Sequence, residues 1–277
     1  KAARQRPWHG NGPLGPTDQR DRGEAGWPLE SASALAFGDG YTVPSALDRE
    51  DIARVRRQFV DATRRALDAG FDVVELHAAH GFLLHSFMSP VTNHRQDAYG
   101  GDFAGRHRLP LEVLQDARQT WPADRPLFVR VSAMDGVDGG RTFDETLEFA
   151  RHAGRAGVDV IDCSSGGLAG HSASTARAGA PRAYGFQVPY AERIRHEAGV
   201  ASMAVGLITE PELADSVISV GRADLVAIGR QALFDPNWPL HAQIALGRND
   251  KAVPFASWPE PYGWWLNGRQ RIFDSMK

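Results

Sequence analysis

Cysteine is almost absent from this chain of 277 residues, in which Cys163 is the single example. One thiol rules out an internal disulfide framework and any metal centre built from several cysteines. It also favours a reducing compartment, and we therefore expect a cytoplasmic location.

The chain also lacks long hydrophobic runs and any strong excess of charge of one sign. No apolar run is long enough to cross a bilayer. The formal net charge is -3, and the charged residues are spread along the sequence rather than gathered in blocks. Neither a membrane nor a nucleic acid is therefore expected as a partner, and a small molecule is the expected ligand.

Residues 1–47 form a loop-rich opening region, because glycine and proline interrupt it throughout. A flexible linker and a long substrate-side loop of a barrel both fit this composition. Aromatic side chains favour the second interpretation, since they can pack and so order a loop; they are Trp8, Trp27, Phe37 and Tyr41. Regular patterns follow over residues 48–277, so we expect one domain over the whole chain, with a C-terminal tail.

Short apolar segments alternate with segments of helical pattern after this opening region. The expected strands cover residues 73–76, 127–131, 158–163, 202–205 and 225–228. The expected helices cover about 49–69, 106–120, 143–156, 189–198 and 210–220, with another opening at 229–230. Asp48, Thr142 and Thr209 are suitably placed to cap three of these helices.

The five expected strands are apolar along almost their whole length, which indicates a parallel sheet covered on both faces. Strand alternating with helix at this rhythm is typical of a doubly wound open sheet or of part of a (β/α)8 barrel. Periodicity alone does not separate the two. Five units are too few to close an eight-stranded barrel.

Residues suited to binding an anionic, planar ligand lie on or just after four of the five strands. They are His77 with His80, Arg130, Gly206, and Gly229 with Arg230. Barrel enzymes collect catalytic groups from several strand ends in this way. Glycines before helix N-termini at the last two strands, with an arginine beside them, favour a phosphate site there. A single such glycine would indicate only a turn.

The pair His77 and His80 admits three interpretations. The two rings can bind a metal ion, although no third ligand stands at a suggestive spacing. They can also be purely structural. As neutral imidazoles they can instead donate two hydrogen bonds to one carbonyl or nitro oxygen and polarise it. We favour oxygen binding and expect no metal site; His85 and His94 are expected to be surface or packing residues.

Several motifs stand in a fixed order along the chain: H-A-A-H-G-F-L-L-H-S-F-M-S-P-V-T-N-H-R-Q-D-A-Y-G-G, F-V-R-V-S, D-C-S-S-G, A-V-G-L-I-T and A-I-G-R. Together they resemble the Old Yellow Enzyme family of flavin-dependent ene-reductases, above all its bacterial branch with the xenobiotic reductases. The first motif is long and highly specific, whereas the last two carry little alone. The resemblance covers the chain from its first residues to its end.

The resemblance implies a (β/α)8 barrel that holds FMN non-covalently. NADH or NADPH would supply hydride, and an α,β-unsaturated carbonyl or nitro compound would accept it at its activated double bond. It implies these roles: His77 and His80 bind the substrate oxygen and are catalytic, Phe82 lies in the substrate site, Arg130 lies at the pyrimidine end of the flavin, and Gly206, Gly229 and Arg230 hold the FMN phosphate.

Arg130 has an alternative role, because an arginine in an apolar strand is costly to bury without a partner. It can form an internal ion pair with Glu75 or Asp162. It can instead stabilise the negative charge that develops on a flavin ring as it accepts hydride. We favour the second role.

The segment P-Y-G-W-W-L near the C-terminus resembles one that lends an aromatic residue to the substrate pocket of a neighbouring subunit. Trp265 matches that position better than Trp264. A homodimer or homotetramer is therefore expected. Packing of both rings in the core of this chain is an equally matched alternative.

Two departures from the family pattern stand out. The opening K-A-A-R-Q-R-P-W resembles the loop after the third barrel strand, so we expect five β/α units of a barrel without its first three strands. Phe82 stands where the family usually has a tyrosine that protonates the substrate, and phenylalanine has no proton to give. The alternatives to ene-reduction are therefore double-bond isomerisation, reduction of nitro compounds or nitrate esters, and an inactive fragment.

Overall fold

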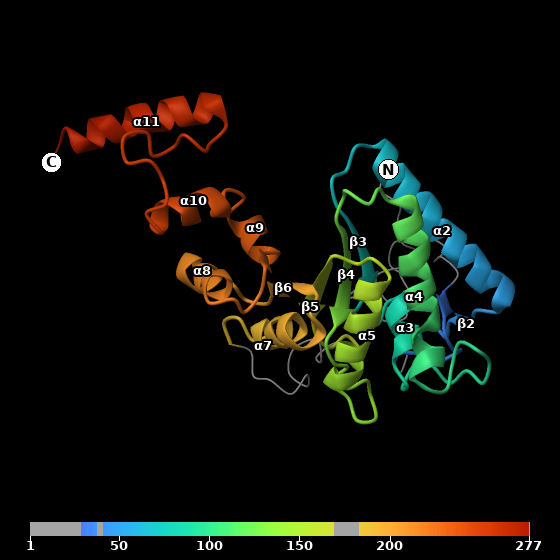
Figure 1. The fold of residues 1–277 in the computed structure, drawn as a ribbon. Helices are drawn as coiled ribbons and strands as arrows, with labels where there is room; N and C mark the ends of the chain where they lie inside the picture. Colours follow the sequence, from blue (N-terminus) through green and yellow to red (C-terminus); the bar gives the residue numbers. More distant parts are fainter. Residues whose placement is uncertain (1–28, 38–40, 169–182, 277) are drawn as a thin grey trace.

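The computed structural model describes residues 29–37, 41–168 and 183–276 (Figure 1). The opening motif and the aromatic residues Trp8 and Trp27 lie outside these residues. Within them, the main feature is a five-stranded parallel sheet. Its strands are β3 (Val74–Ala78), β4 (Leu127–Ser132), β5 (Val160–Ser164), β6 (Ala201–Val205) and β7 (Leu225–Ala227).

The order of the strands decides between the two architectures that the sequence leaves open. The spatial order β3-β4-β5-β6-β7 is also the chain order. A doubly wound sheet reverses its strand order at one point, whereas a (β/α)8 barrel adds each strand beside the previous one. The sheet is therefore part of a barrel, as the family resemblance implied, and the doubly wound alternative does not apply.

Helices connect the strands on the outer side of the sheet. The helix α2 (Arg49–Asp68) precedes β3, and α3 (Leu83–Met88) with α4 (Phe103–Thr120) joins β3 to β4. The later connections are α5 (Phe143–Arg155), then α7 (Val188–Arg193) continuing as the π-helix η1 (Ile194–Ala198), and then α8 (Pro211–Ser219). All five predicted units are present, with boundaries that differ by a few residues.

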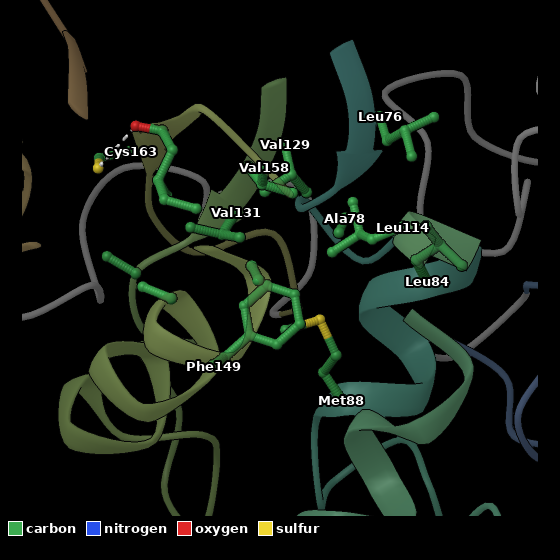
Figure 2. Close-up of a cluster of buried hydrophobic side chains, with 14 of the residues drawn as sticks. Leu76, Ala78, Leu84, Met88, Leu114, Val129, Val131, Phe149, Val158 and Cys163 are labelled. Carbon is green, nitrogen blue, oxygen red and sulfur yellow. Dashed lines mark hydrogen bonds between the residues drawn. The ribbon is translucent and has the colours of Figure 1, made fainter. Parts of the chain in front are cut away.

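The core lies between the sheet and these helices (Figure 2). Alternate strand residues Leu76, Ala78, Val129 and Val131 point into it and are almost fully buried. Met88 and Phe149 meet them from α3 and α5. Because strand side chains alternate in direction, the residues between these lie on the opposite, barrel-facing side of the sheet.

Two of the three predicted helix caps are confirmed. The side chains of Asp48 and Thr142 each accept a hydrogen bond from the backbone N–H of the third residue of their helix. The acidic side chain of that third residue in turn accepts a hydrogen bond from the backbone N–H of the cap. The prediction for Thr209 is wrong, because α8 starts one residue later, with Glu210 as its N-cap. Pro211 presets the first helical φ there, so the start needs no side-chain cap.

The structure also refines the expectations for the two ends of the chain. Inside the region expected to be loop, β1 (Glu30–Ser31) and β2 (Ser45–Ala46) form a short parallel pair. The helix predicted to open at residues 229–230 is confirmed as α9 (Arg230–Phe234), and the expected C-terminal tail holds two further helices, α10 (Trp238–Ala245) and α11 (Glu260–Asp274). Figure 1 shows α11 extending away from the sheet.

In the described part of the chain, β3 pairs with a neighbour along one side only. A groove of about 700 Å³ lies beside this open edge, between β3 and α2. Apolar side chains including Val55, Phe59 and Leu76 line it. The barrel is therefore open along β3 in the described residues.

Candidate functional site

The barrel-facing side of the sheet carries most of the predicted site residues. The register of the strands places His77 beside Arg130, and Arg130 beside Asp162. These residues alternate with core residues such as Leu76 and Val129, so they share the face away from the helices. The site follows from strand order, because each of the three comes from a different strand.

His77, His80 and Phe82 lie together at the carboxyl end of β3. The ring centroids of His77 and His80 are 5.1 Å apart, and those of His77 and Phe82 are 5.0 Å apart. His80 has a φ of 58°, in the left-handed region that a residue other than glycine seldom adopts. Strained backbone of this kind is concentrated at binding and catalytic sites.

Both imidazoles are neutral at neutral pH. Burial, helped by the charge of Arg130, lowers the pKa of His77 to about 4. Burial, helped by the neighbouring His77 and Arg130, lowers the pKa of His80 to about 3. A neutral imidazole keeps one N–H to donate, so the pair suits an uncharged acceptor oxygen. Such donors stabilise an oxygen that gains negative charge.

Two serines that the sequence did not single out hold His80. The Ser132 Oγ accepts a hydrogen bond from the His80 backbone N at 2.9 Å and donates to the Gly166 carbonyl at 2.7 Å. The Ser164 Oγ lies 2.5 Å from His80 Nε2. Ser132 and Ser164 end the neighbouring strands β4 and β5. Only the folded sheet brings them to the histidine, so no sequence pattern near residue 80 indicates them.

Arg130 forms the internal ion pair that was the alternative to a role beside a flavin. Its Nε lies 3.2 Å from Asp162 Oδ2. Burial raises the pKa of Asp162 to about 6, although the charge of Arg130 opposes this. Burial and the charge of Asp162 also raise the pKa of Glu75, to about 7. The three residues form one charged cluster inside the barrel.

This cluster retains unused hydrogen-bonding capacity. Among the described residues, Arg130 Nε and Asp162 Oδ1 are buried and have no partner with hydrogen-bond geometry. Buried polar groups are normally paired. The Nε–H faces Asp162 Oδ2 without hydrogen-bond alignment, so the ion pair does not saturate the guanidinium, and a planar ring with oxygen and nitrogen acceptors, such as the isoalloxazine of FMN, can accept from it. The ion pair and a contact with FMN are therefore compatible.

The predicted phosphate residues lie at the ends of adjacent strands. Gly206 follows β6, and Gly229 is the N-cap of α9 just after β7. Gly206 has a φ of 120°, and a Cβ there would approach the Phe186 ring at 2.9 Å, so this position requires glycine. Gly229 and Arg230 are exposed to solvent. An anion can therefore approach the backbone at Gly229, where an added Cβ would meet nothing within 4 Å.

Trp264 and Trp265 lie on α11 and are 64% and 71% exposed. Their ring centroids are 4.6 Å apart. Packing of these rings in the core of the chain, one of the two alternatives, is wrong. The helix extends outward and therefore presents both rings to solvent.

Neither a metal centre nor a membrane span is found in the part of the chain that the structure describes. No three histidine, cysteine or acidic side chains gather there as metal ligands would. No helix there combines the length and the apolar character that crossing a membrane requires.

The barrel sheet thus brings together paired neutral imidazoles and an interior arginine, with glycines at its last two strand ends. The chain belongs to the NADH:flavin oxidoreductase / NADH oxidase family, whose model matches residues 9–250. This FMN-binding family of NAD(P)H dehydrogenases agrees with the Old Yellow Enzyme resemblance and with the cofactors it implies.

Curated relatives support the same assignment. The chain is 43% identical over 204 residues to an NADPH dehydrogenase of Bacillus subtilis (strain 168), covering 74% of this chain and 58% of the relative. It is 40% identical over 226 residues to an NADPH dehydrogenase of Halalkalibacterium halodurans, covering 82% of this chain and 64% of the relative. The chain thus spans less than two thirds of the length of these relatives.

Solved structures resemble the fold. Histamine dehydrogenase from Rhizobium sp. 4-9 matches with a TM-score of 0.67 and 30% identity, over 79% of this chain and 32% of that chain. A 2-naphthoyl-CoA reductase complex matches with a TM-score of 0.72 and 24% identity, over 80% of this chain and 34% of that chain. Morphinone reductase matches with a TM-score of 0.65 and 23% identity, over 79% of this chain and 60% of that chain. The last two support the barrel fold alone.

Proposed function

We propose that the complete protein is an FMN-dependent NADPH dehydrogenase that reduces electrophilic alkenes activated by a carbonyl or nitro group. The observation that carries this proposal is the pair of half-buried, neutral imidazoles of His77 and His80, 5.1 Å apart on the barrel-facing side. Two neutral donors directed at one oxygen lower the energy of the negative charge that forms there. NADPH is proposed over NADH because the curated relatives are NADPH dehydrogenases.

The chain's own residues have distinct tasks in this proposal. His77 and His80 bind and polarise the acceptor oxygen. Arg130 would hold the pyrimidine end of the flavin, and Gly206, Gly229 and Arg230 would hold its phosphate. The bound FMN would supply the hydride-transfer chemistry between NADPH and the alkene.

A second candidate function follows from Phe82. Its ring lies 5.0 Å from that of His77, so it borders the proposed substrate position, yet it holds no transferable proton. Hydride transfer does not need that proton, but completion of alkene reduction does. Reduction of nitro compounds or nitrate esters, or return of the hydride with isomerisation of the double bond, is therefore the alternative.

We also propose that the protein forms a homodimer or homotetramer in which Trp265 enters the substrate pocket of a neighbouring subunit. The 71% exposure of Trp265 on an outward-extending helix supports this arrangement. A large aromatic ring gains free energy when a partner removes it from water. Trp264 beside it adds to the same exposed surface.

An absorbance spectrum and a turnover assay test the function together. We expect the complete protein to purify with a visible flavin band and to oxidise NADPH in proportion to 2-cyclohexenone reduced. Consumption of NADPH in stoichiometric amounts separates a reductase from an isomerase. A protein that binds no FMN under any condition would support the inactive alternative. The 277-residue chain, measured beside it, tests whether these residues bind FMN by themselves.

A further inference from the structure

A buried polar cluster lies beneath the turn that carries His80 and has no task in the proposed chemistry. Its centre is the pair His85, on α3, and Asp135, which follows β4; both side chains are fully buried. The His85 Nε2 lies 2.8 Å from Asp135 Oδ1. The sequence predicted only a surface or packing role for His85, because its partner is 50 residues away.

The contacts of His85 determine its tautomer. The backbone N–H of Gly81 donates to His85 Nδ1 at 2.8 Å. A backbone amide can only donate, so Nδ1 must carry a lone pair and the proton must be on Nε2. The Nε2–H then donates to Asp135. His85 is therefore a neutral imidazole that links the carboxylate to the Gly81 amide, and burial lowers its pKa in agreement with this.

Asp135 is itself rigidly held. Its Oδ2 accepts hydrogen bonds from the Ser89 hydroxyl and the Arg141 backbone N, both at 2.6 Å. Burial alone would raise the pKa of Asp135, but the hydrogen bond from His85 and the charge of Arg141 hold it at about 2. The anchor of His85 is thus an ionised side chain fixed by several donors, which gives strong hydrogen bonds.

The other end of the linkage is the strained turn. His80 and Gly81 have φ values of 58° and 75°, so two consecutive residues adopt the left-handed conformation. The left-handed conformation costs a residue with a Cβ, such as histidine, conformational free energy, so contacts with the surrounding structure must hold it in place. Ser132 holds the His80 amide, and His85 holds the next amide along the chain. Together they fix the backbone that carries the His80 ring, while Ser164 contacts the ring itself.

We propose that His85 is a positioning residue that fixes the His80–Gly81 turn through its Nδ1 contact with the Gly81 amide and thereby aims the His80 ring at the acceptor oxygen. The inference rests on the proposed function, since it takes His80 as the oxygen-binding group. His85 does not touch the substrate; it acts through the Gly81 amide. Neither the family resemblance nor the relatives assign it this task.

Two substitutions separate the two contacts of His85. In His85→Asn, the side-chain oxygen can stand near the position of Nδ1 and still accept from Gly81, but the side chain is too short to reach Asp135. In His85→Gln, the amide can reach Asp135, but no acceptor stands at the Nδ1 position. A positioning role depends on the Gly81 contact, whereas a purely structural role depends on the buried charge of Asp135 keeping its donor.

We expect His85→Gln to lower kcat/KM for 2-cyclohexenone by about 10- to 100-fold in the complete, FMN-loaded protein, as a small misplacement of a reacting group does. His85→Asn should stay within about threefold of wild type in kcat/KM, while its melting temperature falls further. His107→Gln is the matched control. His107 is also fully buried in a helix, but its Nδ1 contacts only the Phe103 carbonyl of α4, so kcat/KM should not change.

A second measurement does not depend on turnover. Histidine ring NMR should show an altered environment of His80 in His85→Gln and not in His85→Asn. Hydrogen exchange at the Gly81 amide should likewise be faster than in wild type in His85→Gln and unchanged in His85→Asn. Equal loss of kcat/KM in both variants, following their melting temperatures, would overturn the proposal. Unchanged His80 resonances in His85→Gln would also overturn it. A wild type that binds no enone would instead overturn the proposed function, and the NMR comparison would still decide the role of His85.

Discussion

At the scale of single residues, the short segment from His77 to Phe82 concentrates the proposed chemistry. It holds the oxygen-binding pair and the residue that replaces the usual proton donor. The first motif indicated all three residues, because their order and spacing are a property of the sequence. The neutral state of His77 and His80 was not visible in the sequence, because burial and the charge of Arg130 on the next strand lower their pKa values.

Restoring a proton donor should change the reaction of the complete protein. We expect Phe82→Tyr to raise turnover of 2-cyclohexenone by about 10²-fold, because a positioned general acid contributes at least that much. The measurement is NADPH oxidation at saturating enone, with a nitro acceptor as the comparison that needs the donor less. An unchanged enone rate would contradict the role assigned to this position.

The lowered pKa values of the two histidines predict a pH dependence of stability. The folded protein keeps His80 neutral down to a pKa of about 3, while the unfolded chain takes up a proton near pH 6.5. Stability is therefore lost as the pH falls below 6.5. We expect wild type to lose about 1–2 kcal/mol more than His80→Gln between pH 7 and pH 5.

Urea unfolding at the two pH values measures this difference. His94→Gln removes an exposed histidine outside the site and serves as the control. Equal losses of stability in wild type and His80→Gln would show that burial does not hold this ring neutral.

At the scale of elements, two loops pack directly against each other to build the site. The turn after β3 carries His80, and the loop after β5 presses Gly167 against it. A Cβ on Gly167, which has a φ of 103°, would stand 2.3 Å from the His80 Cα. Sequence reasoning placed both loops at strand ends but not in contact, because such contact depends on the close approach of two backbones.

The variant Gly167→Ala tests this contact. We expect it to lose more than the ~1–2 kcal/mol that a left-handed backbone costs a residue with a Cβ, and to bind 2-cyclohexenone more weakly. Gly199→Ala is the matched control, since Gly199 also has a positive φ, of 68°, but an added Cβ would meet nothing within 4 Å.

Thermal unfolding and a flavin absorbance titration with the enone measure the two effects. Equal destabilisation in both glycine variants, with unchanged enone binding in Gly167→Ala, would show that the loop contact is not essential to the site.

At the scale of the whole molecule, the open barrel and the outward α11 are the dominant features. The sheet lacks a partner along β3 within the described residues, beside a groove of about 700 Å³. The apolar side chains on α11 remain in water in a single chain. Exposed aromatic surface of this kind marks an interaction site.

Self-association should therefore depend on α11. We expect the double substitution Trp264→Ser and Trp265→Ser to weaken the oligomer of the complete protein by at least about tenfold in dissociation constant, since two buried aromatic rings contribute a few kcal/mol. Sedimentation equilibrium measures this. Tyr184→Ser, which removes another exposed aromatic ring outside α11, should leave the oligomer unchanged.

The sequence by itself determined the five strand–helix units and the residues at the strand ends. Both depend on local rules: apolar strands, helix caps and turn glycines are encoded within a few residues of each element. The prediction that Thr209 caps a helix was wrong because α8 begins at Pro211, which starts the helix without a side-chain cap.

Only the tertiary structure decided which of these elements are neighbours. Periodicity left the barrel and the doubly wound sheet open, and the order β3 to β7 agrees with the barrel that the family resemblance implied; the same order brought Arg130 against Asp162 and Ser132 against His80. Contacts between residues 30 to 60 positions apart depend on the register and packing of whole strands. No local pattern encodes that register, so the residues that hold the site in place emerge only from the folded chain.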